Sequence, residues 1–312
     1  MKKSKKIIFI VGPTAVGKTV VALSLAKKIN GEIVSCDSMQ VYKEASIASN
    51  KPSLENLEEI LHHLINIISA TEDFDVGYFQ KKALAAIKAI HAKGKIPIIV
   101  GGSGMYMSVL LDGIFENSPK DSNLRKTLEA QTKQAGSESL YQRLLKVDSD
   151  AAQKIHSNDT KRIIRALEVF LLKHQPISAL QKNRQGLWGK FDIKVFALNR
   201  SREELYALIN QRVEEMFRRG LVEEIQRLLK MKLSQSARQI IGIKEVKGFL
   251  DGQYDLERAK YFLKLHTRHY AKRQWTWFRK DKRLQWMMVQ PTETAQQTAE
   301  RILEEICVIA SD

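Results

Sequence analysis

Residues 12–19 read GPTAVGKT and match the pattern G-x-x-x-x-G-K-[ST] at every fixed position. The apolar, β-branched run Ile7–Val11 precedes this stretch, and a run with helical spacing, VVALSLAKKI, follows it at 20–29. A strand, a glycine-containing loop and a helix in this order are the context in which the pattern forms a phosphate-binding loop. The stretch therefore predicts an α/β fold with a parallel sheet flanked by helices, of the P-loop NTPase type.

The residue types in this loop suit a chain of phosphates. Glycine at 12 and 17 lets the backbone approach a diphosphate, and the start of the following helix offers unpaired N–H groups to an anion. Lys18 adds a positive charge, and the Thr19 hydroxyl suits Mg²⁺, which we expect as cofactor, with Thr19 as the metal ligand. The pattern leaves the identity of the phosphate compound open. The residues expected to bind it are Gly12, Pro13, Thr14, Ala15, Val16, Gly17, Lys18 and Thr19.

Two further strand–loop units follow, and both end in polar residues. Asp37 comes after the predicted strand Glu32–Cys36, and the loop Gly101-Gly102-Ser103-Gly104 comes after the predicted strand Ile96–Val100. Ligands of open α/β sheets bind at the carboxyl ends of the strands, so these residues are expected near the phosphate loop. The glycines of the second loop would let the backbone pass close to a ligand, and Ser103 would hydrogen-bond it. Asp37 could hold Mg²⁺, act as a base or cap a turn, and the pattern alone does not choose among these roles.

Later segments suggest two domains. The stretch from about 117 to 189 is polar, rich in Lys, Gln and Ser, and helical in spacing, which predicts a helical insertion domain with soft boundaries. Residues 191–198 read as a strand that returns to the sheet, and long helices follow it. We therefore assign 1–116 and 190–312 to the α/β core and its helical, basic C-terminal part, and 117–189 to the insertion.

The composition points to an anionic partner. The 312 residues carry a formal net charge of +16, with 44% hydrophobic and 28% charged residues, as in ordinary globular proteins. No run approaches the roughly 20 apolar residues of a membrane helix, so no membrane association is expected. Cys36 and Cys307 lack metal-site or disulfide spacing, which favours a cytoplasmic location.

The densest basic segment is 258–283, with ten Lys or Arg against one Asp, a local net charge of +9. Aromatic residues are interleaved with these cations, a combination expected of proteins that bind irregular or single-stranded nucleic acid. Because the segment has helical spacing, part of it must face the core. We expect Phe262, Leu265 and Trp277 to point inward.

Taken together, the motifs resemble those of the tRNA dimethylallyltransferases, also called tRNA isopentenyltransferases. The resemblance spans nearly the whole chain, in the order and spacing of that family. It rests on GPTAVGKT at 12–19, DSMQVYK at 37–43, GGSGMY at 101–106, KRIIRALEV at 161–169, IGIKE at 241–245 and TRHYAKRQWTWFR at 267–279.

The resemblance implies transfer of the dimethylallyl group of dimethylallyl diphosphate to N6 of the adenosine next to the anticodon, position 37 of the tRNA, with release of diphosphate. Catalytic roles then fall to Asp37, as the base that orients N6 and takes its proton, and to Ser103, Lys18, Thr19 and Arg212. The expected partner is the anticodon loop, from which the base is flipped out, and we expect a monomer. The implied tRNA-binding residues are Asp37, Ser38, Met39, Gln40, Ser103, Arg125, Lys161, Arg162, Ile163, Ile164, Arg165, Gln239, Gly242, Lys244, Lys272, Arg273, Gln274 and Arg279, with Arg125 matching only loosely.

Departures from the family pattern leave other hypotheses open. Ser103 stands where the family has Thr, which keeps the hydroxyl, and Ile243 stands where it has Tyr.

One alternative function is that of an adenylate isopentenyltransferase that acts on free AMP or ATP, and the basic segment argues against it. Another is a small-molecule P-loop kinase, which the position of Asp37 permits. A third, an RNA-binding protein with a vestigial loop, is disfavoured by the intact Lys18, Thr19 and Asp37.

Overall fold

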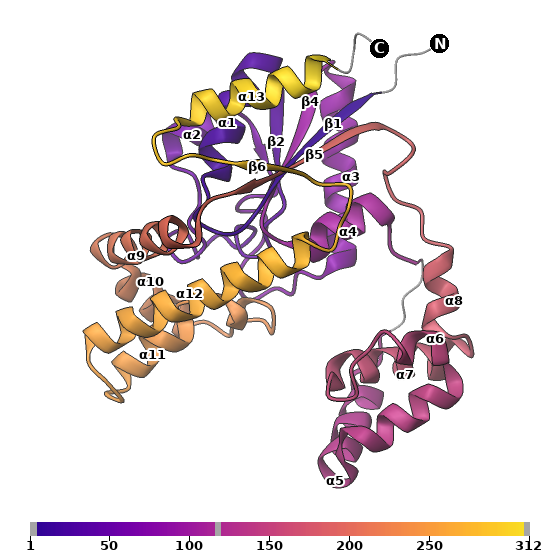
Figure 1. Ribbon diagram of the computed structural model, residues 1–312. Coiled ribbons are helices and arrows are strands. Elements are labelled where there is room, and N and C mark those ends of the chain that lie inside the picture. Colours follow the sequence, from indigo (N-terminus) through magenta and orange to yellow (C-terminus); the bar gives the residue numbers. More distant parts are fainter. Residues whose placement is uncertain (1–4, 116–119, 309–312) are drawn as a thin grey trace. The chain divides into compact units, whose positions relative to one another are not determined.

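The computed structural model describes residues 5–115 and 120–308 (Figure 1). The chain divides into two compact units. Unit 1 comprises Met1–Leu110 and Trp188–Asp312, and unit 2 comprises Leu111–Leu187.

Unit 1 is built on a six-stranded sheet in which every neighbouring pair of strands is parallel. The strand order is β3-β2-β4-β1-β5-β6, so the first strand lies near the middle and is buried along nearly its whole length. Parallel strands covered on both faces are continuous apolar runs, as seen in IIFIV and IPIIV. The strands are β1 (Lys6–Val11), β2 (Gly31–Ser35), β3 (His62–His63), β4 (Ile96–Gly101), β5 (Asp192–Asn199) and β6 (Gln285–Met288).

Helices cover the sheet and continue beyond it. The first helix, α1, and the last, α13, pack together against one side of the core, and α12 lies alongside α9 and α11 (Figure 1). The helices of this unit are α1 (Lys18–Ile29), α2 (Leu54–Glu59), α3 (Val76–Ala92), α4 (Gly104–Asp112), α9 (Arg202–Arg218), α10 (Leu221–Leu229), α11 (Ile243–Leu250), α12 (Leu256–Phe278) and α13 (Ala295–Val308), with a 3₁₀ turn at Ala237–Gln239.

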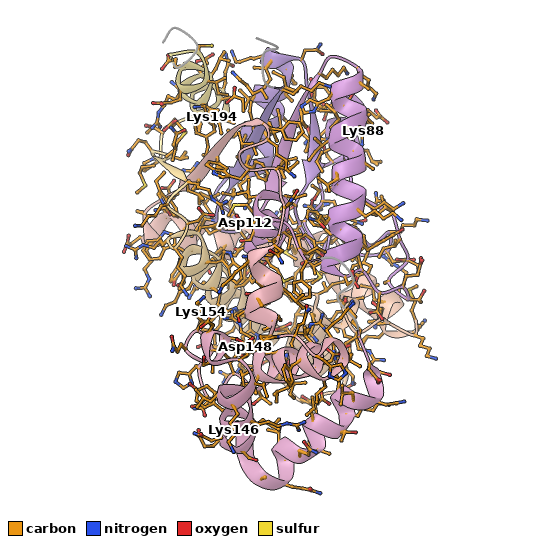
Figure 2. The ribbon with its side chains drawn as sticks, turned by 90° about the vertical axis from the view of Figure 1, so that its right-hand side faces the viewer. Lys88, Asp112, Lys146, Asp148, Lys154 and Lys194 are labelled. Carbon is orange, nitrogen blue, oxygen red and sulfur yellow. The ribbon has the colours of Figure 1, made fainter. Side chains whose placement is uncertain are left out.

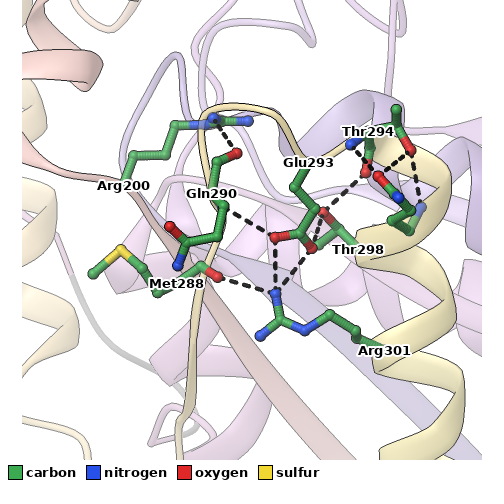
Figure 3. Close-up of polar contacts among 8 residues, drawn as sticks. Arg200, Met288, Gln290, Glu293, Thr294, Thr298 and Arg301 are labelled. Atoms are coloured by element: carbon green, nitrogen blue, oxygen red, sulfur yellow. Dashed lines mark hydrogen bonds and ion pairs between the residues drawn. The ribbon is translucent and has the colours of Figure 1, made fainter.

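The turn before α13 is fixed by a buried carboxylate (Figure 3). Glu293 accepts hydrogen bonds from the Gln290 N–H, at 3.0 Å, and from the Thr298 hydroxyl, at 2.8 Å, and it pairs with Arg301 at 2.9 Å. Burial by itself raises the pKa of Glu293, but these hydrogen bonds outweigh it and leave the pKa below its usual value. Arg200, at the end of β5, then donates to the carbonyl of Gln290 at 3.4 Å and to that of Val16 at 3.2 Å. Contacts therefore run from α13 to the loop before α1.

Unit 2 is helical and has its own apolar core. Its helices are α5 (Ser122–Val147), α6 (Ser149–Ala152), α7 (Thr160–Lys173) and α8 (Ile177–Lys182). Leu128, Leu144 and Leu167 are among the side chains buried between them. Asp148, labelled in Figure 2, caps α6 by accepting from the Ala151 N–H at 3.0 Å and also accepts from the Ser178 N–H at 2.9 Å. One carboxylate thus joins the starts of two short helices.

The predicted fold class is confirmed: a parallel sheet of the P-loop type, flanked by helices, with the predicted strands in place as β1, β2, β4 and β5. Unit 2 spans Leu111–Leu187, whereas the sequence predicts an insertion at 117–189, whose first boundary falls at residues outside the described part of the chain. In the part of the chain that the structure describes, no helix is both long and apolar enough to cross a membrane.

Candidate functional site

The stretch 12–19 forms a tight loop between β1 and α1. Gly12 has a φ of +142°, and a Cβ there would lie 2.5 Å from the carbonyl oxygen of Leu198 on β5, so a side chain is excluded. The side chains of Pro13, Ala15 and Val16 are buried, which leaves the backbone of the loop and the start of α1 to face a ligand. This is the geometry of an anion site at a helix N-terminus.

Two cations lie beside the loop. Lys18 donates from Nζ to the carbonyls of Gly12, at 3.0 Å, and Pro13, at 2.7 Å. Arg212, on α9, donates from Nη1 to the Thr14 hydroxyl at 3.0 Å. Burial, and then the nearby Arg212 charge, lower the pKa of Lys18 to about 7, while Asp37 acts in the opposite direction. Two cations held close together in a desolvated place are stabilised by a multiply charged anion.

Asp37 follows β2 and lines the same cavity as Lys18 and Arg212. One carboxylate oxygen accepts the Met39 N–H at 2.8 Å, which fixes the orientation of the side chain. Burial raises the pKa of Asp37, and the Met39 N–H, Lys18 and Arg212 only partly oppose that rise. A carboxylate with a raised pKa is a better proton acceptor than one in water.

Two cavities meet at these residues. The first, of about 350 Å³, is lined by the phosphate loop and extends past Ser35 and Gln40 to Asn56 and His62. The second, of about 320 Å³, lies between the loop that follows β2 and helix α12. Thr14, Asp37 and Arg212 line both cavities. A compound bound at the phosphate loop and another bound beside α12 would therefore meet at the Asp37 carboxylate.

The glycines at 101–104 have a packing role that the sequence does not predict. A Cβ on Gly101 would lie 2.0 Å from the carbonyl oxygen of Cys36, one on Gly102 2.1 Å from Nε2 of Gln274, and one on Gly104 2.2 Å from the Trp277 ring. Close packing of the protein on itself therefore requires glycine at these three positions. Gly101 also lines the first cavity, so the expectation that the loop comes close to a ligand stays a prediction. The N–H of Ser103 donates to the carbonyl of Cys36, the residue before Asp37, at 3.3 Å.

The metal-binding potential of the site rests on oxygen atoms. Among residues 5–115 and 120–308 no group of three or more His, Cys, Asp or Glu side chains is placed to hold a metal ion. Thr19, in the first turn of α1, lines the first cavity beside Lys18 and Asp37. A hydroxyl at this position fits Mg²⁺ that takes its remaining ligands from phosphate oxygens and water.

Several predicted RNA contacts lie around the second cavity. Ser38, Met39, Gln239 and Arg273 line it, and they come from three separate elements of unit 1. Lys244, Lys272 and Arg279 are exposed, and the Arg279 guanidinium lies 4.2 Å from the centre of the Trp275 ring. Gln40 lies in the first cavity, and Gly242 is buried at the start of α11.

The buried face of α12 differs from the predicted one. The prediction that Trp277 lies in the core is wrong, because it is 39% exposed although one edge of its ring packs on Gly104. Phe262 and Leu265 are only half-buried. The buried residues are Ala259, Leu263, Thr267, Ala271, Gln274 and Phe278. The prediction failed because small and polar side chains occupy much of the inward stripe, whereas large aromatic side chains occupy its edges.

Gln274 also requires a correction as an expected tRNA contact. Its side chain is 6% exposed, and both ends of the amide have partners within the protein. Oε1 accepts the Thr14 N–H at 2.8 Å, and Nε2 donates to the carbonyl of Gly102 at 2.8 Å. The amide therefore has no surface for RNA.

Unit 2 contains the remaining predicted contacts. Lys161 and Arg162 are exposed at the start of α7, and Arg162 pairs with Asp159 at 3.2 Å. Ile163 and Ile164 are buried in the core of the unit, so the expectation that their side chains touch RNA is corrected: they are the apolar stripe of an amphipathic helix.

The two remaining arginines of unit 2 share one carboxylate. Arg125 and Arg165 both pair with the fully buried Glu168, Arg125 through two hydrogen bonds of 2.8 Å. Burial raises the pKa of Glu168, but hydrogen bonds from Arg125, the Asp121 N–H and Arg165 outweigh it and lower the pKa overall. The hydrogen bonds that both guanidinium groups make to Glu168 thus stabilise unit 2.

Glu224, which no sequence motif predicts, holds a loop that lines both cavities. This carboxylate on α10 is buried and accepts the N–H groups of Ser46, Ile47 and Ala48 at 2.8–3.1 Å. The loop that it holds continues into Ser49 and Asn50, which line both cavities. A Glu within an ordinary amphipathic helix gives no signal of this role in the sequence.

Comparisons with known proteins agree with these observations. A family model described as IPP transferase matches residues 40–281. The tRNA dimethylallyltransferase of Carboxydothermus hydrogenoformans is 44% identical over 305 residues, covering 97% of this chain and 96% of the relative. The tRNA dimethylallyltransferase of Thermotoga maritima is 42% identical over 284 residues, covering 90% of this chain and 92% of the relative.

Solved structures are similar over most of their length. A tRNA delta(2)-isopentenylpyrophosphate transferase from Staphylococcus epidermidis is 35% identical, with a TM-score of 0.69, covering 97% of this chain and 99% of the other. A eukaryotic dimethylallyltransferase acting on tRNA is 31% identical, with a TM-score of 0.83, covering 97% of this chain and 80% of the other. With a family model matched over most of its length and relatives well above 30% identity, this chain belongs to the IPP transferase family.

Proposed function

We propose that this chain is a tRNA dimethylallyltransferase, which transfers the dimethylallyl group of dimethylallyl diphosphate to N6 of adenosine 37 in tRNA and releases diphosphate. The observation that carries the proposal is the position of Asp37 where two cavities meet, one lined by the phosphate loop and the other by the basic helix α12. The names of the relatives support the same substrates.

In this reaction the diphosphate lies against the loop and the start of α1. As the C–O bond to the dimethylallyl carbon breaks, negative charge grows on the leaving oxygen, and Lys18 and Arg212 stabilise it. Backbone N–H groups at the start of α1 do the same. Thr19 would hold Mg²⁺ there, which supplies further positive charge to the diphosphate when bound.

The adenine enters from the second cavity with its amine toward Asp37. The lone pair of this amine is delocalised into the ring, so the amine is a weak nucleophile. The carboxylate accepts a hydrogen bond from N6–H, orients the amine and takes its proton as the C–N bond forms. The dimethylallyl group thus replaces one hydrogen on N6, the proton passes to Asp37, and diphosphate leaves.

The acceptor is proposed as RNA because of the surface around the second cavity. Arg273 lines that cavity, Lys272 is exposed on the same helix, and Arg279 is exposed directly after its end. A free nucleotide would need no such extended cationic surface. We further propose that the protein acts as a monomer and in the cytoplasm.

A labelling experiment tests the proposal. The protein is incubated with dimethylallyl diphosphate labelled in the prenyl group, together with unmodified tRNA or AMP, and separately with ATP. We expect the label to appear in tRNA. In Asp37→Asn the rate of labelling should fall by orders of magnitude, while the affinity for tRNA stays within a few-fold. Label in AMP alone would indicate a free-nucleotide enzyme, and turnover of ATP alone a kinase. Near-normal turnover in Asp37→Asn would remove Asp37 as the base.

A further inference from the structure

One buried amide joins two loops of the candidate site. The Gln274 side chain accepts from the Thr14 N–H in the phosphate loop and donates to the carbonyl of Gly102 in the loop after β4, both at 2.8 Å. These loops follow different strands, and Gln274 comes from a third element, α12, about 260 residues further along the chain than Thr14. Buried polar groups that are fully paired in this way hold their surroundings in one arrangement.

Helix α12 contacts the loop after β4 at a second residue, Trp277, one turn further along the helix than Gln274. Trp277 lies over Gly104, where a Cβ would come within 2.2 Å of its ring. Gln274 fills the corresponding space at Gly102. Residues three apart share one face of a helix, so α12 is seated on this loop through two neighbouring side chains. Neither a rotation nor a slide of α12 leaves both contacts intact.

The same helix carries the cations expected to bind RNA. Arg273 lines the second cavity, and Lys272 and Arg273 directly precede Gln274. On the phosphate side, Thr14 is held twice: its N–H donates to Gln274, and its hydroxyl accepts from Arg212 at 3.0 Å. A chain of contacts therefore runs from the RNA-facing side of α12 to the diphosphate loop.

We infer that Gln274 is a positioning residue that couples the two substrate sites, so that RNA on α12 strengthens binding of the diphosphate and the reverse. This inference rests on the proposed function. Because linkage is reciprocal, each ligand must change the affinity of the other by the same factor. The role differs from an RNA contact, which would affect RNA affinity whether or not the diphosphate is bound.

The experiment measures binding, with inorganic pyrophosphate and unmodified tRNA as probes. The dissociation constant of each is determined in the absence and presence of the other, for the full-length protein and for Gln274→Met. This substitution keeps the length of the side chain and removes both hydrogen bonds. The matched control is Gln296→Met, the same change at an exposed helix position. Wild type and control are expected to show a coupling factor of about 5 or more, and Gln274→Met a factor within twofold of 1.

Other outcomes separate the possibilities. An unchanged coupling factor in Gln274→Met overturns the inference, whatever happens to the melting temperature. Weaker tRNA binding without pyrophosphate and with unchanged coupling would make Gln274 an RNA contact instead. Should Gln274→Met not fold, Gln274→Glu is used: it keeps the acceptor for Thr14, loses the donor to Gly102, and is expected to lower the coupling factor at least twofold. If wild type binds neither probe, the proposed function itself fails. Binding of both without coupling refutes this inference alone.

Discussion

Replacement of Gly101 by Ala is expected to slow the reaction by displacing Asp37. A Cβ there would lie 2.0 Å from the carbonyl oxygen of Cys36, which directly follows the neighbouring strand β2. Close carbon–oxygen contacts lie at about 3.3 Å, so the two backbones must separate by about 1 Å. Asp37 directly follows Cys36 and would move with it. Because a misplacement of about 1 Å at a reacting group costs on the order of 100-fold, kcat should fall about 100-fold while tRNA affinity stays within a few-fold.

The assay is transfer of labelled dimethylallyl to tRNA at saturating substrates, with the melting temperature measured in parallel. Gly31→Ala is the matched control, because its Cβ would crowd Ile98 Cδ1 at 2.8 Å at the opposite end of the same strand pair. Both variants should lose about 1–3 kcal/mol of stability through overpacking, but only Gly101→Ala should lose turnover. A folded Gly101→Ala with kcat within threefold of wild type would refute the reasoning that the β2–β4 contact positions the carboxylate.

Two further predictions concern charge in and around the site. The pKa of Lys18 is lowered to about 7, chiefly by burial, so above pH 7 the protein must take up a proton to bind pyrophosphate with Lys18 charged. The affinity should therefore weaken as pH rises above 7, and Lys18→Arg should flatten that trend in calorimetric titrations; identical pH slopes in the two proteins would contradict the assignment. Glu224→Gln removes an acceptor and the charge that hold three N–H groups, which should lower the free energy of unfolding by about 3 kcal/mol. Thermal denaturation measures it against the exposed neighbour Glu223→Gln, and equal melting temperatures of the two variants would show that the carboxylate does not hold the loop.

Local patterns were enough to predict the centre of the sheet and the phosphate loop. The strands β1, β2, β4 and β5 each contain an apolar run and are followed by polar or glycine-containing residues, so their type and their order along the chain follow from short stretches of sequence. The strands β3 and β6 have two and four residues, too short to leave a period-2 or apolar signal. The sequence therefore predicts the core of the sheet and not its edges.

The site was predicted less completely, for a physical reason. Lys18 and Asp37 belong to motifs whose chemistry is visible in a few neighbouring residues. Gln274 and Glu224 act on backbone groups more than 170 residues away, and such partners leave no trace in local composition. The packing role of the glycines at 101–104 was not predicted, because a sequence shows that a side chain is missing but does not show what fills the space.

The hydrogen bonds around Glu293 tie the last helix of the chain to the loop that begins the site. Arg200 connects the two, because it donates hydrogen bonds both to the carbonyl of Gln290, in the segment before α13, and to the carbonyl of Val16. A truncation before Glu293 would leave every motif residue in the sequence. It would nevertheless remove hydrogen bonds that stabilise the phosphate loop. Intact motifs are thus no guarantee of a working enzyme when shortened versions of this chain are made.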